Sequence, residues 1–144
     1  DRPVNKFGAS FIGTPPMNFF NGQVLGQNSS MAFLSEDGLQ LQIAQQQVDK
    51  LRQFDKQKIV LGIRPEHIGS TVAENSETVG QISAIVNVVE PMGAETYVYL
   101  KSETTSFVSR VSSHKKYMVG EKIELAVAID RAHFFDFNTD KALL

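Results

Sequence analysis

Cysteine is absent from this chain of 144 residues. The protein therefore has no disulfide framework and no thiol chemistry, which fits a reducing compartment. The sequence also lacks any run of about 18 apolar residues of the kind that crosses a bilayer. No charged-then-apolar leader opens the chain. We expect neither a visible secretion signal nor a segment inserted in a membrane.

An excess of charge of either sign is also missing. Lys and Arg together number 14 and Asp and Glu together 16, so the formal net charge is −2. Proteins that bind nucleic acids usually carry a basic domain with a clustered patch. The sequence therefore predicts no nucleic-acid partner.

The common motifs of catalytic and cofactor sites do not occur. There is no GxxxxGK[ST] phosphate loop and no GxGxxG after a strand. The three histidines, His67, His114 and His133, have no metal-ligand spacing. No nucleophile-elbow pattern surrounds a serine. We expect no catalytic residues, no bound metal and no cofactor in this chain.

The length and composition predict one globular domain. Hydrophobic residues make up 42% of the chain and charged residues 21%, which are ordinary values for such a domain. A compact chain of this length buries roughly 68–70% of the surface that its unfolded form exposes. A core of that size needs no metal or disulfide to hold it together.

Strand patterns dominate the chain. Apolar spacing predicts a helix at residues 3–13, which Gly13 can end, and a short surface helix within residues 45–54. Strands are predicted at residues 17–25, 30–34, 38–42, 58–64, 78–90, 95–101, 105–111, 121–130 and 133–137. Many short strands separated by turn signals indicate an all-β barrel or sandwich.

Turn chemistry marks three places between or within these strands. Asn21-Gly22 predicts a turn or bulge. Glu90-Pro91-Met92-Gly93 suits a type I turn with proline at its second position. Asn138-Thr139-Asp140 predicts a turn near the end of the chain.

The longest predicted strand, residues 78–90, is nearly continuous in apolar residues. Alternation divides its apolar side chains between two sides, with Ile82, Ala84, Val86 and Val88 on one side and Ile85 and Val89 on the other. One side of a barrel strand packs inward, so the second set needs cover from the rest of the chain or from a partner. Homodimers provide such cover with the same patch on both subunits. Self-association is thus one of the two ways in which this second set can be covered.

Three other features could bind ligands, although the fold explains them more simply. Tyr97 and Tyr99 share one face of a strand but have no basic residue between them, unlike a surface that stacks nucleotides. The basic stretch at residues 114–117 is expected to be a solvated loop tip. His133, which precedes two phenylalanines, is expected to be a structural histidine.

The stretch LGIRPEHI, residues 61–68, places an Arg, a Glu and a His at the end of an apolar strand. Pro65 holds Arg64 in an extended conformation and ends the strand ladder. Glu66 and His67 then lie in a fixed turn, where ordered side chains can serve recognition. An ion pair between Arg64 and Glu66 could equally do no more than pin the turn.

Two segments together carry a family resemblance. FIGTPPMNFF at residues 11–20 and LGIRPEHI at residues 61–68 resemble, in this order, the C-terminal regulatory region of MalK-type ATPase subunits of sugar-importing ABC transporters. DRPVNKFGASFIG at the start and RAHFFDFNTDKAL near the end are similar to the family's junction helix and terminal segment. The matches span residues 1–143. In two departures, Gly8 replaces an apolar helix position and Asp140 stands where the family usually has glycine.

The resemblance implies an all-β, OB-type (TOBE-like) β-barrel with a short N-terminal helix and one further short helix. Residues 1–13 would be the junction helix of an upstream ATPase domain, and residues 14–144 the OB-type regulatory domain. The chain would then be a fragment, and the ATP and Mg sites would lie upstream of it. The matching motif residues would belong to the fold and to a pairing surface: Pro15, Pro16, Met17, Asn18, Gly62, Arg64, Pro65, Glu66 and His67.

The function implied is that of a regulatory and dimerisation domain in the ATP-binding subunit of an ABC-type sugar, or sugar/glycerol phosphate, importer. Its partners would be a second regulatory domain, the upstream ATPase domain and, through that domain, the membrane subunits. The implied location is cytoplasmic, on the inner face of the cell membrane. The alternative is a stand-alone OB-type module that binds a small anion or an oligosaccharide. The N-terminal helix favours the first reading, because it makes sense as a connector.

Overall fold

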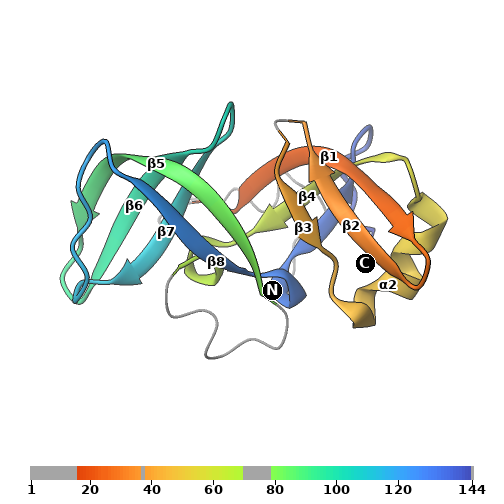
Figure 1. Ribbon diagram of the computed structural model, residues 1–144, viewed down its shortest axis with the longest axis horizontal. Helices are drawn as coiled ribbons and strands as arrows, with labels where there is room; N and C mark the ends of the chain where they lie inside the picture. Colours follow the sequence, from red (N-terminus) through yellow and green to blue (C-terminus); the bar gives the residue numbers. More distant parts are fainter. Residues whose placement is uncertain (1–15, 37, 70–78, 144) are drawn as a thin grey trace.

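The computed structural model describes residues 16–36, 38–69 and 79–143 of the chain. Two curled antiparallel sheets lie side by side, with the short helix α2 at the far end of the first sheet (Figure 1). The all-β, OB-type prediction is confirmed, and the structure adds that the strands are shared between two sheets. The helix predicted at residues 3–13, with its Gly8 departure, lies outside the described residues. The boundary predicted between residues 13 and 14 stays a prediction.

The first sheet is built from both ends of the chain. Its strands, in the order β3-β2-β1-β4-β9, are β3 (Gln40–Gln42), β2 (Ser30–Ser35), β1 (Asn18–Gln27), β4 (Lys58–Ile63) and β9 (His133–Asp136). The predicted surface helix is confirmed as α2 (Gln45–Leu51), which the 3-10 turn η1 (Arg52–Phe54) continues. Val48 and Leu51 of α2 are fully buried, so this helix covers one end of the core.

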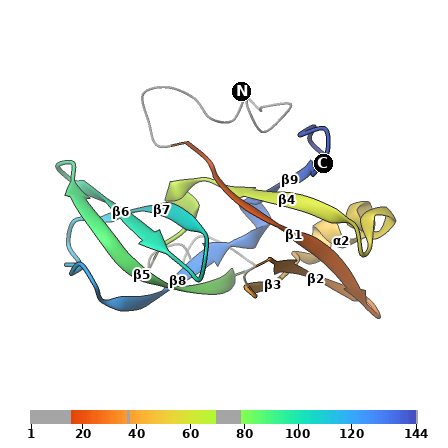
Figure 2. The same ribbon diagram turned by 90° about the horizontal axis from the view of Figure 1, so that it is seen from above.

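The second sheet is a meander with one returning strand. Its order is β7-β6-β5-β8, from β7 (Ser106–Ser112), β6 (Glu95–Lys101), β5 (Val79–Pro91) and β8 (Lys122–Ala128). Two 3-10 turns carry the chain between the sheets, η2 (Pro65–His67) after β4 and η4 (Ile129–Arg131) before β9. Seen from above, β4 points towards the second sheet, and η2 lies beside β7 (Figure 2).

One continuous core joins the two sheets. Alternating side chains of β4 and β1 face it from the first sheet, and those of β5, β6 and β8 face it from the second. A smaller apolar cluster of Met17, Val60 and Phe135 lies on the opposite side of the first sheet. This explains why β4 reads as an unbroken apolar run, since five of its six residues are buried.

Gly22 lies within a continuous strand, and no turn forms at Asn21-Gly22. Strand β1 runs from Asn18 to Gln27 and pairs with β2 on one side and β4 on the other. A Cβ atom at Gly22 would overlap the Leu34 carbonyl oxygen and the Phe33 ring. The glycine is needed for close approach of the backbones, which the turn signal in the sequence did not distinguish.

A β-bulge in β5 corrects the predicted division of its side chains. The register with β6 shifts between Val86, opposite Leu100, and Val88, opposite Tyr99. An extra residue in one strand reverses the alternation beyond it. Val88 is therefore exposed on the outer face, whereas Val89 packs against the core. The sequence-based assignment of these two valines was wrong.

The turn after β5 also differs from the expected one. Pro91 is still part of the strand, and the turn is closed by the Met92 N–H donating to the Glu95 carbonyl at 2.7 Å. Gly93 has a φ of 91° in this turn, a conformation that glycine adopts without steric cost. The proline signal marked the end of the strand and not the second position of the turn.

The predicted turn at residues 138–140 is confirmed and explains one departure from the family. Asp136 Oδ1 accepts the N–H groups of Asn138 and Thr139 at 2.8 and 2.9 Å. These bonds hold the pKa of Asp136 below its usual value. Asp140 has a φ of 62°, in the left-handed region that glycine tolerates best and aspartate tolerates better than most residues.

Candidate functional site

The motif residues at the end of β4 form the segment that carries the chain from the first sheet to the second. Arg64 has extended backbone angles, and Pro65 occupies the first position of η2, where its missing N–H costs nothing. The His67 N–H donates to the Arg64 carbonyl at 2.9 Å. Pro65 is buried, and Arg64, Glu66 and His67 are half-buried.

Beyond η2 the chain contacts both edge strands of the second sheet. Ile68 is fully buried and forms a β-bridge with Val127 of β8. Its carbonyl accepts a hydrogen bond from the Ser109 hydroxyl of β7, and the Gly69 N–H donates to Ala126 of β8 at 2.9 Å. The segment thus closes the gap between β7 and β8, which would otherwise present unpaired edges.

The two sequence motifs that carried the resemblance lie next to each other. Phe19 of β1 pairs with Gly62 of β4. A Cβ atom at Gly62 would lie 2.5 Å from Met17 Sδ and 2.9 Å from Phe135 Cε2. Gly62 therefore leaves space that the buried Met17 side chain fills. This gives both residues a packing role.

Asn18 ties the two sheets together. Its side-chain amide donates from Nδ2 to the Val108 carbonyl at 2.8 Å and accepts the Val108 N–H at Oδ1, also at 2.8 Å. The amide takes the place of a neighbouring strand at the free edge of β7, next to the residue that binds Ile68. The sequence motif included Asn18, but nothing in the pattern indicated its partner 90 residues away.

A groove of about 540 Å³ lies beside this clamp. Residues 16–19 form one wall, and Val88, Tyr99 and Val108 are among the residues that line the rest. Pro16 is exposed at the rim. Pro15 lies outside the described residues, so its place in the motif is untested.

The predicted ion pair between Arg64 and Glu66 does not form in the part of the chain that the structure describes. An ion pair that does form joins Arg110 Nε of β7 to Glu95 Oε1 of β6 at 3.4 Å. The turn at residues 65–67 is held by its backbone bonds and by the buried Pro65 ring, so it needs no such pair.

His67 faces the second connection between the sheets. Its Nε2 lies 3.5 Å from Nη1 of Arg131 in η4. Burial lowers the pKa of His67 below 6.5, and the positive charges of Arg131 and Arg64 lower it further, while Glu66 and Asp130 oppose the shift. The neutral imidazole is therefore favoured in the folded protein.

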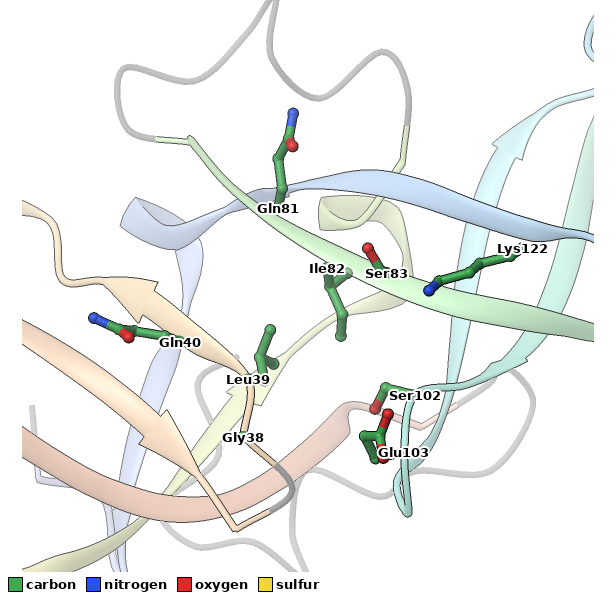
Figure 3. Close-up of a pocket in the computed structure, with 9 residues that line it drawn as sticks. All are labelled: Gly38, Leu39, Gln40, Gln81, Ile82, Ser83, Ser102, Glu103 and Lys122. Atoms are coloured by element: carbon green, nitrogen blue, oxygen red, sulfur yellow. The ribbon is translucent and has the colours of Figure 1, made fainter.

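A second hollow, of about 380 Å³, lies between the β2–β3 loop and the second sheet (Figure 3). Leu39 and Ile82 face each other across its apolar part, while Ser83, Ser102 and Glu103 contribute oxygens and Lys122 an ammonium group (Figure 3). Gln40 and Gln81 point away from its centre. No sequence signal indicated this cleft, because its lining comes from four separate segments.

Neither a metal centre nor a membrane helix appears in the described ranges. Residues 16–36, 38–69 and 79–143 contain no cluster of three or more His, Cys, Asp or Glu side chains suited to a metal ion. Within the same ranges, no helix has the length and apolar character needed to cross a membrane.

Curated relatives match the whole length of the chain. The multiple sugar-binding transport ATP-binding protein MsmK of Streptococcus mutans is 36% identical over 146 residues, covering 99% of this chain and 38% of the relative. The trehalose/maltose import ATP-binding protein MalK of Thermococcus litoralis is 29% identical over 153 residues, with the same coverage. The chain therefore spans about 38% of the length of these relatives.

A solved structure and two family profiles agree with the fold. The cytoplasmic molybdate-binding protein ModG superposes with a TM-score of 0.60 at 12% identity, covering 81% of this chain and 94% of that chain. The profile of the MalK OB fold domain matches residues 13–68, and that of the TOBE domain matches residues 61–135. The two ranges overlap at residues 61–68, the segment that joins the sheets. With more than half of its residues matched by the second profile, the chain belongs to the TOBE domain family.

Proposed function

We propose that this chain is the regulatory and dimerisation domain of the ATP-binding subunit of an ABC-type importer of sugars or of sugar or glycerol phosphates. The observation that carries the proposal is the match to MsmK and MalK along 99% of the chain. Both relatives are named as ATP-binding proteins of sugar transport. The chain corresponds to about 38% of their length, and its own residues 61–135 match the TOBE domain.

The construction of the domain suits a mechanical role. A domain that keeps two ATPase subunits together must transmit force without deforming. Here the segment after β4 bonds to both edge strands of the second sheet, and Asn18 bonds to Val108 as well. A continuous core fills the space between the sheets. These ties favour a domain that moves as one body.

ATP chemistry is assigned to a different part of the parent subunit. The chain has no phosphate loop to hold a nucleotide, so ATP and Mg would bind in an upstream ATPase domain. Through that domain the subunit would contact the membrane components. It would then work in the cytoplasm, on the inner face of the cell membrane, and it would have no nucleic-acid partner.

Two measurements test this proposal. The gene upstream of this chain should encode a phosphate loop and an ABC signature motif, and a gene without them would overturn the assignment. The purified chain should show no ATP turnover above that of a mock preparation. ATP turnover that copurifies with the chain and survives further purification would contradict the assignment of ATP hydrolysis to a separate domain.

The cleft of Figure 3 supports a second candidate function, the binding of a small polar ligand. Its volume falls in the range of ligand sites, and it combines an apolar part with a few polar groups. Glu103 and Lys122 place one charge of each sign in the cleft, so a neutral saccharide fits it better than an oxyanion. Calorimetric titration of glucose and maltose to about 10 mM, beside the variant Lys122→Ala, tests this, because a site with a Kd near 1 mM would then be mostly filled. An absence of heat in both titrations would contradict a glucose or maltose site of that strength.

A further inference from the structure

The large exposed apolar side chains of the described residues gather around one strand. Ile85 and Val88 of β5 are 39% and 51% exposed, and Met92, in the turn after β5, is 56% exposed. Met118 and Val119 are 71% and 68% exposed. Their loop is bonded to β5, since Val86 accepts the Gly120 N–H at 2.7 Å and donates to the Glu121 carbonyl at 2.9 Å. Exposed apolar side chains grouped around one strand point to an interaction surface.

The bulge at residues 86–88 adds Val88 to this surface. It turns Val88 outward, opposite Tyr99 of β6, which is itself opposite Val108 of β7. These three side chains form an apolar row across the sheet, which we call the β5 row. The row also lines the groove beside Asn18, whose other wall is residues 16–19. Tyr99 also donates a hydrogen bond to Glu90 Oε1 at 3.2 Å, which holds the ring over the sheet.

Charges of opposite sign flank the β5 row. One step along the strands on one side, Ile85 lies between Lys101 of β6 and Lys122 of β8. One step on the other side, Glu90 lies opposite Tyr97. Tyr97 lies in turn opposite Arg110 of β7, whose charge is paired with Glu95. Over β5 itself, the face is therefore positive on one side of the row and negative on the other.

We propose that two copies of this chain pair face to face through the outer side of the β7-β6-β5-β8 sheet. The two-fold axis runs along the β5 row, across the strands. This inference rests on the proposed dimerisation function and assigns it a surface. Rotation about that axis places Glu90 of the second copy over Ile85, between Lys101 and Lys122, and does the same in reverse. An axis along β5 would instead set Lys101 against Lys122 of the second copy, which like charges disfavour.

Charge reversal tests the arrangement. Sedimentation equilibrium of the full chain, from micromolar to near-millimolar concentration, gives the dimer dissociation constant. Because each contact occurs twice in a two-fold dimer, Glu90→Lys should raise that constant by about tenfold or more, and Lys101→Glu with Lys122→Glu should do the same. All three changes together restore opposite charges and should recover most of the lost affinity. Val88→Asp should also raise the dissociation constant, and adding the three charge changes to it should not restore the affinity.

The control is Lys50→Glu on α2, a charge reversal at an exposed position outside the sheet, which should leave the constant unchanged. Thermal melts establish that each variant is folded. A wild-type chain that stays monomeric throughout would overturn the dimerisation function itself. A wild-type dimer that none of the face variants weakens, or that the triple variant fails to restore, would leave dimerisation standing and overturn this face.

Discussion

Replacing Asn18 with alanine removes the two side-chain hydrogen bonds that join β1 to β7, both of 2.8 Å. Asn18 is 7% exposed, so water competes little for these bonds in the folded protein. The variant leaves the Val108 N–H and carbonyl without their partner. The change therefore isolates one tie between the sheets without touching either strand ladder.

The expected loss follows from the net value of a buried hydrogen bond. Two such bonds contribute about 1–3 kcal/mol, and a backbone group left dry and unpaired costs about 1–3 kcal/mol more. Val108 lines the groove beside the clamp, which gives water a route to its freed backbone groups. We therefore expect Asn18→Ala to lower the free energy of unfolding by about 2–3 kcal/mol.

Urea unfolding at neutral pH measures this loss, because a domain of this size commonly unfolds in one step. Asn21→Ala is the matched control, since Asn21 lies in the same strand with its side chain exposed. Asn18→Asp tests the direction in which stability changes with pH. Its carboxylate faces the Val108 carbonyl, so its pKa should be raised, and the variant should recover stability as the pH falls and the carboxyl becomes a donor. A loss below about 0.5 kcal/mol, the smallest value expected of one such bond, would refute the clamp.

Further predictions concern the neighbouring motif residues. Gly62→Ala should lower the free energy of unfolding, measured in urea, by about 1–3 kcal/mol, because the added methyl group overlaps two buried side chains. An unchanged free energy would show that these side chains can move aside, and would contradict the close packing. Arg64→Ala and Glu66→Ala should give additive losses of stability, because the structure shows no bond between them; a coupling above about 0.5 kcal/mol in the double-mutant cycle would contradict this. Because the pKa of His67 is lowered in the folded protein, the contribution of its neutral side chain to the free energy of unfolding is complete above pH 6.5. That contribution is lost as the pH falls through the pKa of the folded state. His67→Gln should therefore flatten the fall in thermal midpoint below pH 6.5, and an unchanged pH profile would place the titration elsewhere.

Strand positions could be predicted from the sequence because local alternation reports which side of a strand is buried. β6 occurs at residues 95–101, as predicted, and β8 lies inside its predicted range. The short helix within residues 45–54 followed from the spacing of Val48 and Leu51, which are both buried. In these elements, the spacing of apolar residues along the segment itself identifies the buried side.

The division into two sheets and the bulge could not be predicted in the same way. Strand order depends on pairings such as β4 with β9, which join residues far apart in the chain. No residue type in β5 marks the bulge at residues 86–88, which shows only in the register of β5 with β6. Strict alternation therefore assigned Val88 and Val89 to the wrong sides. Asn18 was identified by resemblance, but its partner Val108 depends on how the two sheets meet.

The question that the motif raised, why an apolar strand ends in Arg-Pro-Glu-His, has a structural answer in the closure of the second sheet. Curling brings its edge strands β7 and β8 to opposite sides of one gap, and the segment at residues 64–69 occupies that gap. Its inner side must be apolar and must offer backbone groups, which Pro65, Ile68 and Gly69 supply. Its outer side is half-exposed, so Glu66 and His67 can remain polar there without requiring any catalytic role. The segment and Asn18 occupy the outer edges of β7 and β8 at Val108, Ser109, Ala126 and Val127, and the surface that we propose for a second copy is the outer face of the sheet.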